Sequence, residues 1–535
     1  MNKFLCIALL MFFVAGLYAL NNMQIIQTLV GETPNSYFGF ALTSLDFNGD
    51  GIDDLVVSNG GHKIYVYYGG TQFGFTPDLV RQHVNYDILV SAGDVNGDGF
   101  EDLLTVETYP DSVETNQAIM RFFYGGPNAD LEPDYEIIIP NWGAAGLSIY
   151  PQECIGDTNN DGFDDIGCLW KRTAAGDSTE LAIMLGGSFQ MVSVVTDISS
   201  YPPCIISGLG DVNDDGFDDF MIGYAPENYP YFPRYRYIYF GGNGIDLLNR
   251  VLLMESNSTH MVAPGGWNIG DFNGDGFNDF TITEPIDTRS SLIKFKFGSQ
   301  YLSSSTELVV TASEYLPSLI DYEGNCIAFG DFNGDGFSDV VTGNRNASFW
   351  DGIAGVWLGG ANPNGYYDMA IYPPATSPYH QFGWAVTSGD YNNDGYCDVA
   401  ISSPNSNGSS PTYPGYVYVY AGNAQLADTT VANDDQIIVP LTESITLSIF
   451  PNPFKSGRLN MNYTIDGKLP KNIQNATLVT YNIKGQIISK HSLKMKQVEK
   501  GKGSIISKKL KPGIYIIALI IDNQRTAATK FTIFD

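Results

Sequence analysis

A nine-residue acidic loop recurs seven times along the chain with the pattern Asp-x-Asn-x-Asp-Gly-x-x-Asp. Positions 1, 3, 5 and 9 carry carboxylate or amide oxygens, and position 7 can add its backbone carbonyl. The glycine at position 6 permits the sharp turn that wraps these oxygens around one ion. Such hard oxygen ligands suit Ca²⁺, so each copy predicts a calcium site. The copies run Asp46–Asp54, Asp94–Asp102, Asp157–Asp165, Asp211–Asp219, Asp271–Asp279, Asp331–Asp339 and Asp390–Asp398.

The loops together predict up to seven bound Ca²⁺ ions. Position 4 is Gly, Asn or Asp in every copy, and these residue types tolerate left-handed backbone. The expected ligands, with position 7 contributing its carbonyl, are Asp46, Asn48, Asp50, Ile52 and Asp54; Asp94, Asn96, Asp98, Phe100 and Asp102; Asp157, Asn159, Asp161, Phe163 and Asp165; Asp211, Asn213, Asp215, Phe217 and Asp219; Asp271, Asn273, Asp275, Phe277 and Asp279; Asp331, Asn333, Asp335, Phe337 and Asp339; Asp390, Asn392, Asp394, Tyr396 and Asp398.

The EF-hand shares the opening spacing of these loops but needs a bidentate Glu at position 12 and a helix on each side. The residues at position 12 here are Val57, Thr105, Cys168, Ile222, Ile282, Thr342 and Ile401, none of which can replace that carboxylate. The flanking runs are rich in β-branched and aromatic residues, which favours strands. An EF-hand is therefore excluded, and a dockerin module is disfavoured for the same reason.

The elements that must position the loops repeat with them. Successive loops start 48, 63, 54, 60, 60 and 59 residues apart, a period typical of one supersecondary unit in a closed or stacked array. Each loop is followed by a second apolar run that ends in a glycine turn, as at Tyr67-Tyr68-Gly69-Gly70. The repeat therefore predicts inner strand, acidic loop, second strand, upper loop, third strand, glycine turn and outer strand. Seven such blades predict an all-β, seven-bladed β-propeller.

The chain ends fit closure of the predicted ring. An apolar run, Ile25–Val30, precedes the first inner strand, and the last repeat stops after its third strand, Tyr416–Tyr420. The N-terminal run can serve as the outer strand of the last blade, which removes a free sheet edge. The segment Gln436–Val439 is an alternative occupant of that edge.

The best-formed repeat combines Phe382-Gly383-Trp384-Ala385-Val386, the loop Asp390–Asp398 and the strand Ala400–Pro404. It resembles an FG-GAP repeat of the integrin-alpha N-terminal type, and the resemblance covers residues 22–425. The GAP tripeptide is degenerate in most copies, as at Ser58-Asn59-Gly60, so the calcium loops carry the resemblance better than the motif that names it. The resemblance implies a calcium-binding propeller exposed outside the cell.

Four segments follow from these patterns. Residues 1–20, with Lys3 before an apolar stretch, predict a secretory signal peptide too short to span a membrane. The propeller occupies 21–425, a linker 426–440, and a separate domain 441–535. No later run predicts a membrane helix, so we expect no transmembrane segment in the mature chain.

The last segment differs from the propeller in its motifs. It opens with Ile449-Phe450-Pro451-Asn452-Pro453-Phe454, and its short strands with turn signals predict a small Ig-like β-sandwich. The Pro-Asn-Pro opening, the Asn482-Ile483-Lys484-Gly485 turn, Gly513-Ile514-Tyr515 and the final strand Lys530–Asp535 resemble a type IX secretion type A sorting domain. That resemblance implies recognition by the type IX secretion machinery and a protein secreted from, or attached to the outer surface of, a Gram-negative bacterium. An Ig-like adhesive domain is the alternative.

Charge is divided unevenly between the two parts. Residues 441–535 hold 15 Lys plus Arg against 5 Asp plus Glu, whereas residues 1–440 hold 13 against 54, a net charge of −41. Seven Ca²⁺ ions would neutralise 14 of those charges, and without metal the loops repel themselves. So acidic a domain excludes nucleic acid as an expected partner.

Five cysteines remain after signal removal. Cys154 lies three residues before its loop and Cys168 three residues after, so they face one another if the flanking strands pair in simple register. An exported protein can oxidise such a pair, although two buried thiols are the preferred interpretation. Cys204, Cys326 and Cys397 are interpreted as packing residues.

Loops between second and third strands are predicted on the face opposite the acidic loops. The fourth repeat concentrates aromatic and basic residues there, types that are enriched at binding hot spots. Trp142, Trp267 and Trp384, near the starts of inner strands, are candidates to join that face, although packing between blades is the preferred role for any single aromatic residue. The candidate ligand-binding residues are Tyr224, Tyr229, Tyr231, Phe232, Arg234, Tyr235, Arg236 and Trp350.

The preferred function is an adhesin or other ligand-binding protein for an extracellular glycan or protein. No catalytic residue is assigned, because the five His are isolated and no nucleophile elbow, phosphate-binding loop or zinc-protease helix is present. The alternative is a secreted carbohydrate-active enzyme such as a polysaccharide lyase. In that case Arg234 or Arg236 would neutralise a uronate and a Tyr or His would act as the base.

Overall fold

The computed structural model divides the chain into two compact units, Met1–Ala427 and Asp428–Asp535. It describes residues 23–534 except 35, 61–62, 72, 83–85, 109–116, 141–152, 173–177, 195–202, 225–234, 245–248, 256–266, 286–290, 301, 303–306, 311–325, 346–351, 366, 375–380, 405–412, 427–445, 451–453, 456–459, 467–475, 483–486, 495–499, 501, 507–512 and 522–523. The predicted signal peptide, 1–20, and most of the predicted linker, 426–440, therefore lie outside the described residues.

The first unit consists of seven four-stranded antiparallel sheets. The first three blades are β2 (Phe38–Leu45), β3 (Asp54–Asn59), β4 (Lys63–Tyr67) and β5 (Leu79–Gln82); β6 (Tyr86–Gly93), β7 (Asp102–Thr108), β8 (Gln117–Phe123) and β9 (Tyr135–Pro140); β10 (Glu153–Gly156), β11 (Asp165–Arg172), β12 (Ser178–Leu185) and β13 (Gln190–Val194). The next three are β14 (Pro203–Gly210), β15 (Asp219–Tyr224), β16 (Tyr235–Tyr239) and β17 (Arg250–Glu255); β18 (Asn268–Gly270), β19 (Asp279–Pro285), β20 (Ser291–Lys296) and β21 (Glu307–Val310); β22 (Ile327–Gly330), β23 (Asp339–Asn344), β24 (Ile353–Trp357) and β25 (Met369–Ile371).

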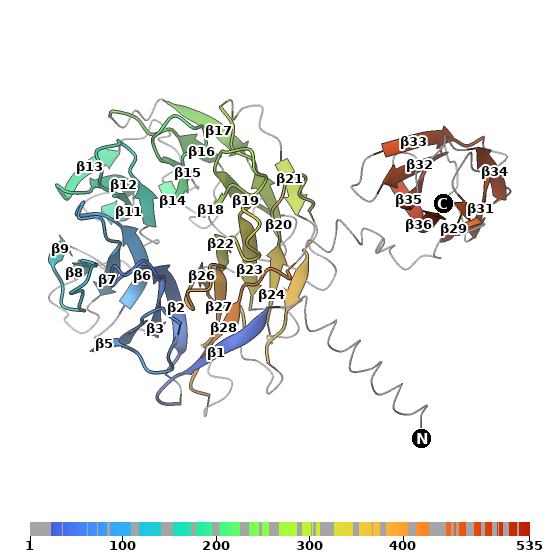
Figure 1. Cartoon of the computed structure of the whole chain (residues 1–535). Helices are drawn as coiled ribbons and strands as arrows, with labels where there is room; N and C mark the ends of the chain where they lie inside the picture. Colours follow the sequence, from blue (N-terminus) through green and yellow to red (C-terminus); the bar gives the residue numbers. More distant parts are fainter. Residues whose placement is uncertain are drawn as a thin grey trace, which may run out of the picture. The chain divides into compact units, whose positions relative to one another are not determined.

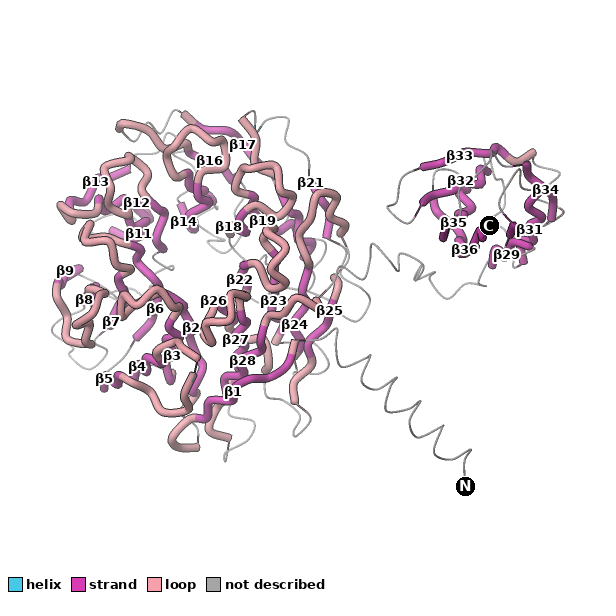
Figure 2. Tube along the Cα trace, viewed as in Figure 1, coloured by secondary structure: helices cyan, strands magenta, loops and turns pink. Residues whose placement is uncertain are grey.

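The inner strands form a closed ring. Each first strand lies beside the first strand of the next blade, from β2 through β6, β10, β14, β18 and β22 to β26 (Val386–Gly389) and back to β2. Figure 1 shows the sheets arranged around a common centre, and Figure 2 shows strands and loops without a helix in the described part of the unit. The prediction of an all-β, seven-bladed propeller is confirmed.

The seventh blade joins the two ends of the propeller. It is built from β26, β27 (Asp398–Ser403), β28 (Tyr416–Ala421) and β1 (Gln24–Val30). β1 pairs antiparallel with β28, with Gln24 opposite Ala421 and Val30 opposite Tyr416. The expectation that Ile25–Val30 closes the ring is therefore confirmed, while the competing segment Gln436–Val439 lies outside the described residues.

The FG dipeptides at this closure have a distinctive backbone. Tyr37 and Gln381 precede Phe38 and Phe382 with positive φ angles of 53° and 59°, and the glycines that follow have φ of 87° and 82°. A Cβ on Gly39 would lie 2.9 Å from Cβ of Ser402 in the seventh blade, so only glycine permits this approach. The first motif thus packs the first blade against the last, whereas a Cβ on Gly383 would lie 2.8 Å from Asn344 N of the sixth blade.

The disulfide hypothesis is wrong because the strand register is not simple. The pairing of β10 with β11 shifts between Cys154 and Gly156, which places Cys154 opposite Ile166. Cys168 lies opposite Ala182 of the next strand, and both thiols are free.

The second unit contains two sheets. The smaller one comprises β29 (Thr446–Phe450), β31 (Asn460–Asp466) and β34 (Lys502–Ile506). The larger one comprises β30 (Phe454–Lys455), β36 (Gln524–Phe534), β35 (Gly513–Ile521), β32 (Ala476–Asn482) and β33 (Ile487–Ser492). β29 of the small sheet lies next to β36 of the large one. No helical stretch in the described part of the chain has the length and hydropathy of a membrane span.

Candidate functional site

All seven acidic loops connect the first and second strands of their blades and share one hydrogen-bonded conformation. The position 1 carboxylate accepts the N–H of position 5 through Oδ1 at 3.0–3.2 Å and the N–H of glycine 6 through Oδ2 at 2.8–2.9 Å. The position 5 carboxylate accepts the N–H of position 7 at 3.0–3.1 Å. The loop is therefore folded by its own acidic side chains.

The backbone explains the two small positions of the loop. Position 6 has φ between 85° and 93° in all seven copies, and a Cβ there would meet no atom within 4 Å. Glycine is required at position 6 by conformation and not by space. Position 4 also has positive φ, including 55° at Asn160 and 58° at Asp214 and Asn393, as its residue types predict.

The position 9 aspartate is a structural anchor as well as a predicted ligand. It is fully buried in every loop, and its Oδ1 accepts an N–H from the glycine turn of the same blade at 2.7–3.1 Å. In six loops Oδ2 accepts an N–H of position 2 or 3, as Asp279 does from Phe272 at 3.0 Å. This side chain therefore ties the acidic loop to the glycine turn between the third and fourth strands.

The pKa values of the position 9 aspartates reflect burial and the nearby acids of the same loop. Burial, reinforced by the nearby Asp50 and Asp46 carboxylates, raises the pKa of Asp54 to about 7. Burial likewise raises the pKa of every other position 9 aspartate, to about 6 at Asp165, about 7 at Asp102, Asp279 and Asp398, and about 8 at Asp219 and Asp339. A cation bound between these carboxylates would relieve that repulsion.

The donor set fits a hard divalent cation. Within the described part of the chain, no three side chains of His, Cys, Asp or Glu are already arranged as ion ligands. The loop acids instead accept backbone N–H groups. The carboxylate oxygens that accept a single hydrogen bond, such as Asp271 Oδ2 and Asp275 Oδ1, keep a further lone pair. Asn159 Oδ1 at position 3 is a buried oxygen without a hydrogen-bond partner. Carboxylate, amide and carbonyl oxygens in one small loop are the ligands that Ca²⁺ takes.

A second set of hydrogen bonds joins each loop to the next blade. The carbonyl of position 2 accepts an N–H from the following blade's glycine turn at 2.7–2.9 Å, seven times around the ring. The ring closes with Gly70 N–H donating to Tyr391 O at 2.9 Å. Each acidic loop therefore contacts both its own blade and its neighbour.

Position 8 adds a further link that the sequence analysis missed. At four junctions its carboxylate accepts the position 1 N–H of the preceding loop: Glu101 from Asp46 at 3.1 Å, Asp164 from Asp94 at 2.7 Å, Asp218 from Asp157 at 2.9 Å and Asp53 from Asp390 at 2.7 Å. At the other three junctions the residue is Asn278, Ser338 or Cys397, whose backbone N–H donates to the position 1 carbonyl at 3.0–3.3 Å. Because the residue type varies, the repeat gives no consensus that signals this role.

The predicted ligand-binding cluster of the fourth blade is only partly described. Tyr224 and Arg236 are fully buried within β15 and β16, and the Tyr224 hydroxyl lies 2.5 Å from that of Tyr239. These two residues pack inside the blade, so they do not present their side chains to a ligand as predicted. Tyr235 is half-buried. Tyr229, Tyr231, Phe232, Arg234 and Trp350 lie outside the described residues, as does Trp142.

Two other aromatic residues take different roles. Trp384 is 5% exposed, its Nε1 donates to Phe40 O at 2.9 Å, and Arg345 lies 3.8 Å over its ring. It therefore packs between blades, as the preferred interpretation of a single aromatic residue predicts. Trp267 is half-buried and lines a cavity at the centre of the ring.

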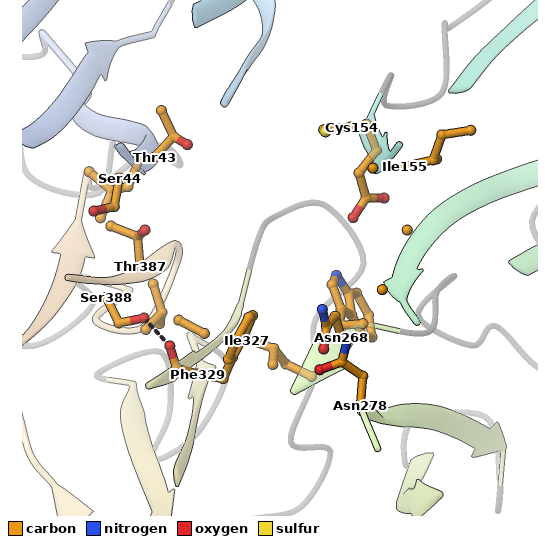
Figure 3. A pocket seen from close by; sticks show the side chains of 18 of the residues that line it. Thr43, Ser44, Cys154, Ile155, Asn268, Asn278, Ile327, Phe329, Thr387 and Ser388 are labelled. Carbon is orange, nitrogen blue, oxygen red and sulfur yellow. Dashed lines mark hydrogen bonds between the residues drawn. The ribbon is translucent and has the colours of Figure 1, made fainter. Parts of the chain in front are cut away.

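The central cavity has a volume of about 550 Å³ and is lined by inner strands from six blades. Figure 3 shows Thr43 and Ser44, Asn268, Phe329, and Thr387 and Ser388 around it, with the Ser388 hydroxyl donating to Phe329 O at 2.6 Å. Sequence reasoning missed this cavity because its wall combines short strands that are far apart in the chain.

Comparison with known families agrees with the blades and the separate C-terminal unit. The FG-GAP repeat matches residues 326–368 and 382–420, and the FG-GAP-like repeat matches 46–105. The Secretion system C-terminal sorting domain matches residues 448–534.

Similar curated proteins share only part of their length with this chain. Human phosphatidylinositol-glycan-specific phospholipase D is 32% identical over 135 residues, 22% of this chain and 16% of that protein. Integrin alpha-PS2 of Drosophila melanogaster is 29% identical over 157 residues, 26% and 11% of the two chains. Funoran endo-beta-hydrolase of Wenyingzhuangia aestuarii is 27% identical over 135 residues, 25% and 16% of the two chains. The chain thus matches less than a fifth of each relative.

Fold and loops together define the class of the protein as a seven-bladed β-propeller with one acidic loop in every blade. The family matches then specify it further: the chain is an FG-GAP repeat protein with a C-terminal type IX secretion sorting domain. The sorting domain indicates a secreted or cell-surface protein.

Proposed function

We propose that this protein is a calcium-binding β-propeller that acts outside the cell as an adhesin or ligand-binding protein for a glycan or another protein. The observation that carries the calcium part is the sevenfold repetition of one loop conformation with the same oxygen donors. The sorting domain supports the extracellular part, because such domains belong to secreted or cell-surface proteins.

Calcium would be held by positions 1, 3 and 5, the carbonyl of position 7, and position 9 of each loop. Its role is structural: it would neutralise carboxylates that otherwise repel one another at a point where two blades meet. This interpretation is supported by the hydrogen bonds that connect every loop to its own glycine turn and to that of the next blade.

A secreted carbohydrate-active enzyme is the second candidate. It is favoured by the similarity to Funoran endo-beta-hydrolase, although the shared stretch is only 16% of that protein. A polysaccharide lyase would have to assemble its site from loops such as the one that contains Arg234, since Arg236 is buried.

The test is binding of the purified full chain to an array of glycans and extracellular proteins, in calcium and in chelator. Calcium-dependent capture of one ligand class that is recovered intact supports the adhesin. Release of unsaturated products from an acidic polysaccharide would replace it with the lyase. A folded, calcium-stabilised protein that binds nothing on the array would contradict the binding function.

A further inference from the structure

The central cavity is lined by aromatic rings, side-chain amides and hydroxyl groups, among them Trp267, Asn268 and Ser388. The inner strands of the blades form its wall, and each of these strands is held in place by the other strands of its blade. The ring of blades therefore fixes the shape of the cavity. Its volume of about 550 Å³ falls within the range of about 300–1,000 Å³ that small-ligand sites occupy. Figure 3 shows polar side chains from opposite sides of the ring around this space.

Apolar ring surface is exposed to the cavity. Phe329 on β22 is 39% exposed, whereas Ile327 and Ala328 immediately before it are each 8% exposed. Trp267, just before β18, also lines the cavity and is half-buried. A large aromatic side chain that stays exposed at the centre of the propeller does not serve core packing. Its flat face is suited to contact with a flat or chair-shaped ligand.

Two amide donors converge beside these aromatic residues. An added Cβ at Gly210 would lie 2.4 Å from Nδ2 of Asn278 and 2.9 Å from Nδ2 of Asn268, so both amides border the same glycine. Asn268 uses its Oδ1 to accept Gly270 N–H at 2.8 Å. Neither Nδ2 has a hydrogen-bond partner within the described part of the chain. Two lining donors are thus available to a ligand oxygen.

The cavity carries little charge. Among the described residues that line it there is no Lys, Arg or His, and the acids are Glu153 and Asp218. Asp218 accepts the Asp157 N–H as an inter-blade link. Burial raises the pKa of Glu153 to about 8, which favours the neutral carboxyl, and the Ser207 side chain forms a hydrogen bond with it. An anionic ligand would find no counter-charge among these described residues.

We propose that the cavity binds an uncharged sugar unit, held between its exposed aromatic surface and the converging Asn268 and Asn278 amides. Hydroxyl groups in a chair-shaped ring match amide, hydroxyl and carboxyl partners, and the C–H faces of the ring match Phe329 and Trp267. An apolar ligand would cover the amide donors and leave them unpaired, which is costly. A uronate or sulfated sugar would lie among acids, with no cationic side chain among the described residues of the lining.

This inference rests on the proposed ligand-binding function and assigns it a site and a ligand class. The probes are neutral hexasaccharides of glucose, mannose and galactose, with a galacturonate hexasaccharide as the anionic comparison. Binding is measured on the full chain in calcium by titration calorimetry and by tryptophan fluorescence. We expect one neutral series to bind and to change the fluorescence of the native protein, an effect that Trp267→Phe removes.

The key variant is Asn278→Asp, because position 8 carries Asp in the first, third and fourth blades and the ring accommodates that side chain. It exchanges the amide donor for an acceptor, so we expect an about tenfold higher Kd for the neutral sugar. Asn268→Asp should act similarly while it keeps an oxygen for Gly270. Tyr372→Ser, at an aromatic residue that is 64% exposed and outside the cavity lining, should leave the Kd unchanged.

The possible outcomes distinguish failure of the cavity inference from failure of the proposed ligand-binding function. Neutral sugars that bind equally to the native protein and to both Asn variants would place the site elsewhere and overturn the inference. Tighter binding of galacturonate than of neutral sugars would overturn the assigned ligand class. If no hexasaccharide binds while another array ligand does, the cavity inference fails and the proposed function stands; silence in both experiments overturns both.

Discussion

Each loop divides its acidic residues between two tasks. Positions 1 and 5 hold exposed or half-buried carboxylates at the loop tip, and position 9 holds a buried carboxylate at its base. The first two cap N–H groups within the loop, whereas the third binds the glycine turn. Substitutions at positions 5 and 9 should therefore differ in their dependence on calcium.

Asp275→Asn tests the metal site with little disturbance of the fold. Asp275 is exposed; its Oδ1 accepts the Phe277 N–H, which an Asn oxygen can also accept, and its Oδ2 accepts the Asn273 side-chain amide of the same loop at 3.0 Å. We expect the calcium-induced rise in Tm to shrink, with the Tm in chelator changed little. Asp130→Asn, at an exposed aspartate that caps a turn outside the loops, is the matched control. Equal calcium stabilisation of Asp275→Asn and the native protein would argue against an ion in that loop.

Asp279→Asn should destabilise the protein even without calcium. Asp279 accepts Gly298 N–H at 2.8 Å and Phe272 N–H at 3.0 Å with different oxygens, and an Asn amide can accept only one of them. The other N–H then faces an NH₂ donor in a buried position, which costs about 1–3 kcal/mol. Chemical unfolding in chelator measures this loss. A variant as stable as the native chain in chelator, yet weakened in calcium, would show that Asp279 acts only as a ligand.

The sequence predicted the acidic loop well because its chemistry is local. Nine consecutive residues contain the carboxylates, the glycine at φ above 85° and the tolerant residue at position 4. The anchoring role of Asp279 depends on Gly298, which lies 19 residues further along, and therefore has no signal within the loop. The role of Asp164 depends on Asp94, which lies 70 residues earlier in another blade. The local sequence pattern thus predicts the conformation of the loop. Its contacts with the glycine turn and with the neighbouring blade can be seen only in the folded propeller.

At the scale of elements, the outer strand β1 has no covalent neighbour within its own blade. It is joined to β28 by antiparallel pairing, and Leu29 packs into a cluster with Leu55, Val417 and Val419 from the first and last blades. The pairing links residues almost 400 positions apart in sequence. Such a closure was predictable because the last repeat lacks an outer strand and the N-terminus supplies one.

Deletion of residues 1–30 should open the ring. The backbone edge of β28 would lose its partner, which exposes N–H and C=O groups to another chain. We expect a lower Tm and oligomers in size-exclusion chromatography. Deletion of residues 1–22, which leaves β1 intact, is the control and should stay monomeric. A monomer of native stability after loss of residues 1–30 would mean that β1 is dispensable for closure.

At the scale of the whole molecule, the ring couples seven similar electrostatic units. The propeller part of the chain carries a net charge of −41 over residues 1–440, and each loop lies in hydrogen-bond contact with the next blade. Charge in one loop is therefore opposed by its neighbours as well as by its own carboxylates. This arrangement makes stability depend jointly on protons and on calcium.

In chelator, stability should fall as the pH rises. The position 9 aspartates have pKa values of about 6 to 8 in the folded protein, above the ordinary value of 3.8, so the folded state holds more protons than the unfolded state between pH 4 and 8. The free energy of unfolding then decreases with pH across that window. Calcium binds the deprotonated carboxylates and should weaken or reverse this slope. Melting curves from pH 5 to 8, with and without calcium, measure both slopes. Parallel curves in the two conditions would mean that the ion does not replace the protons in these loops, and that the calcium part of the proposed function must be abandoned.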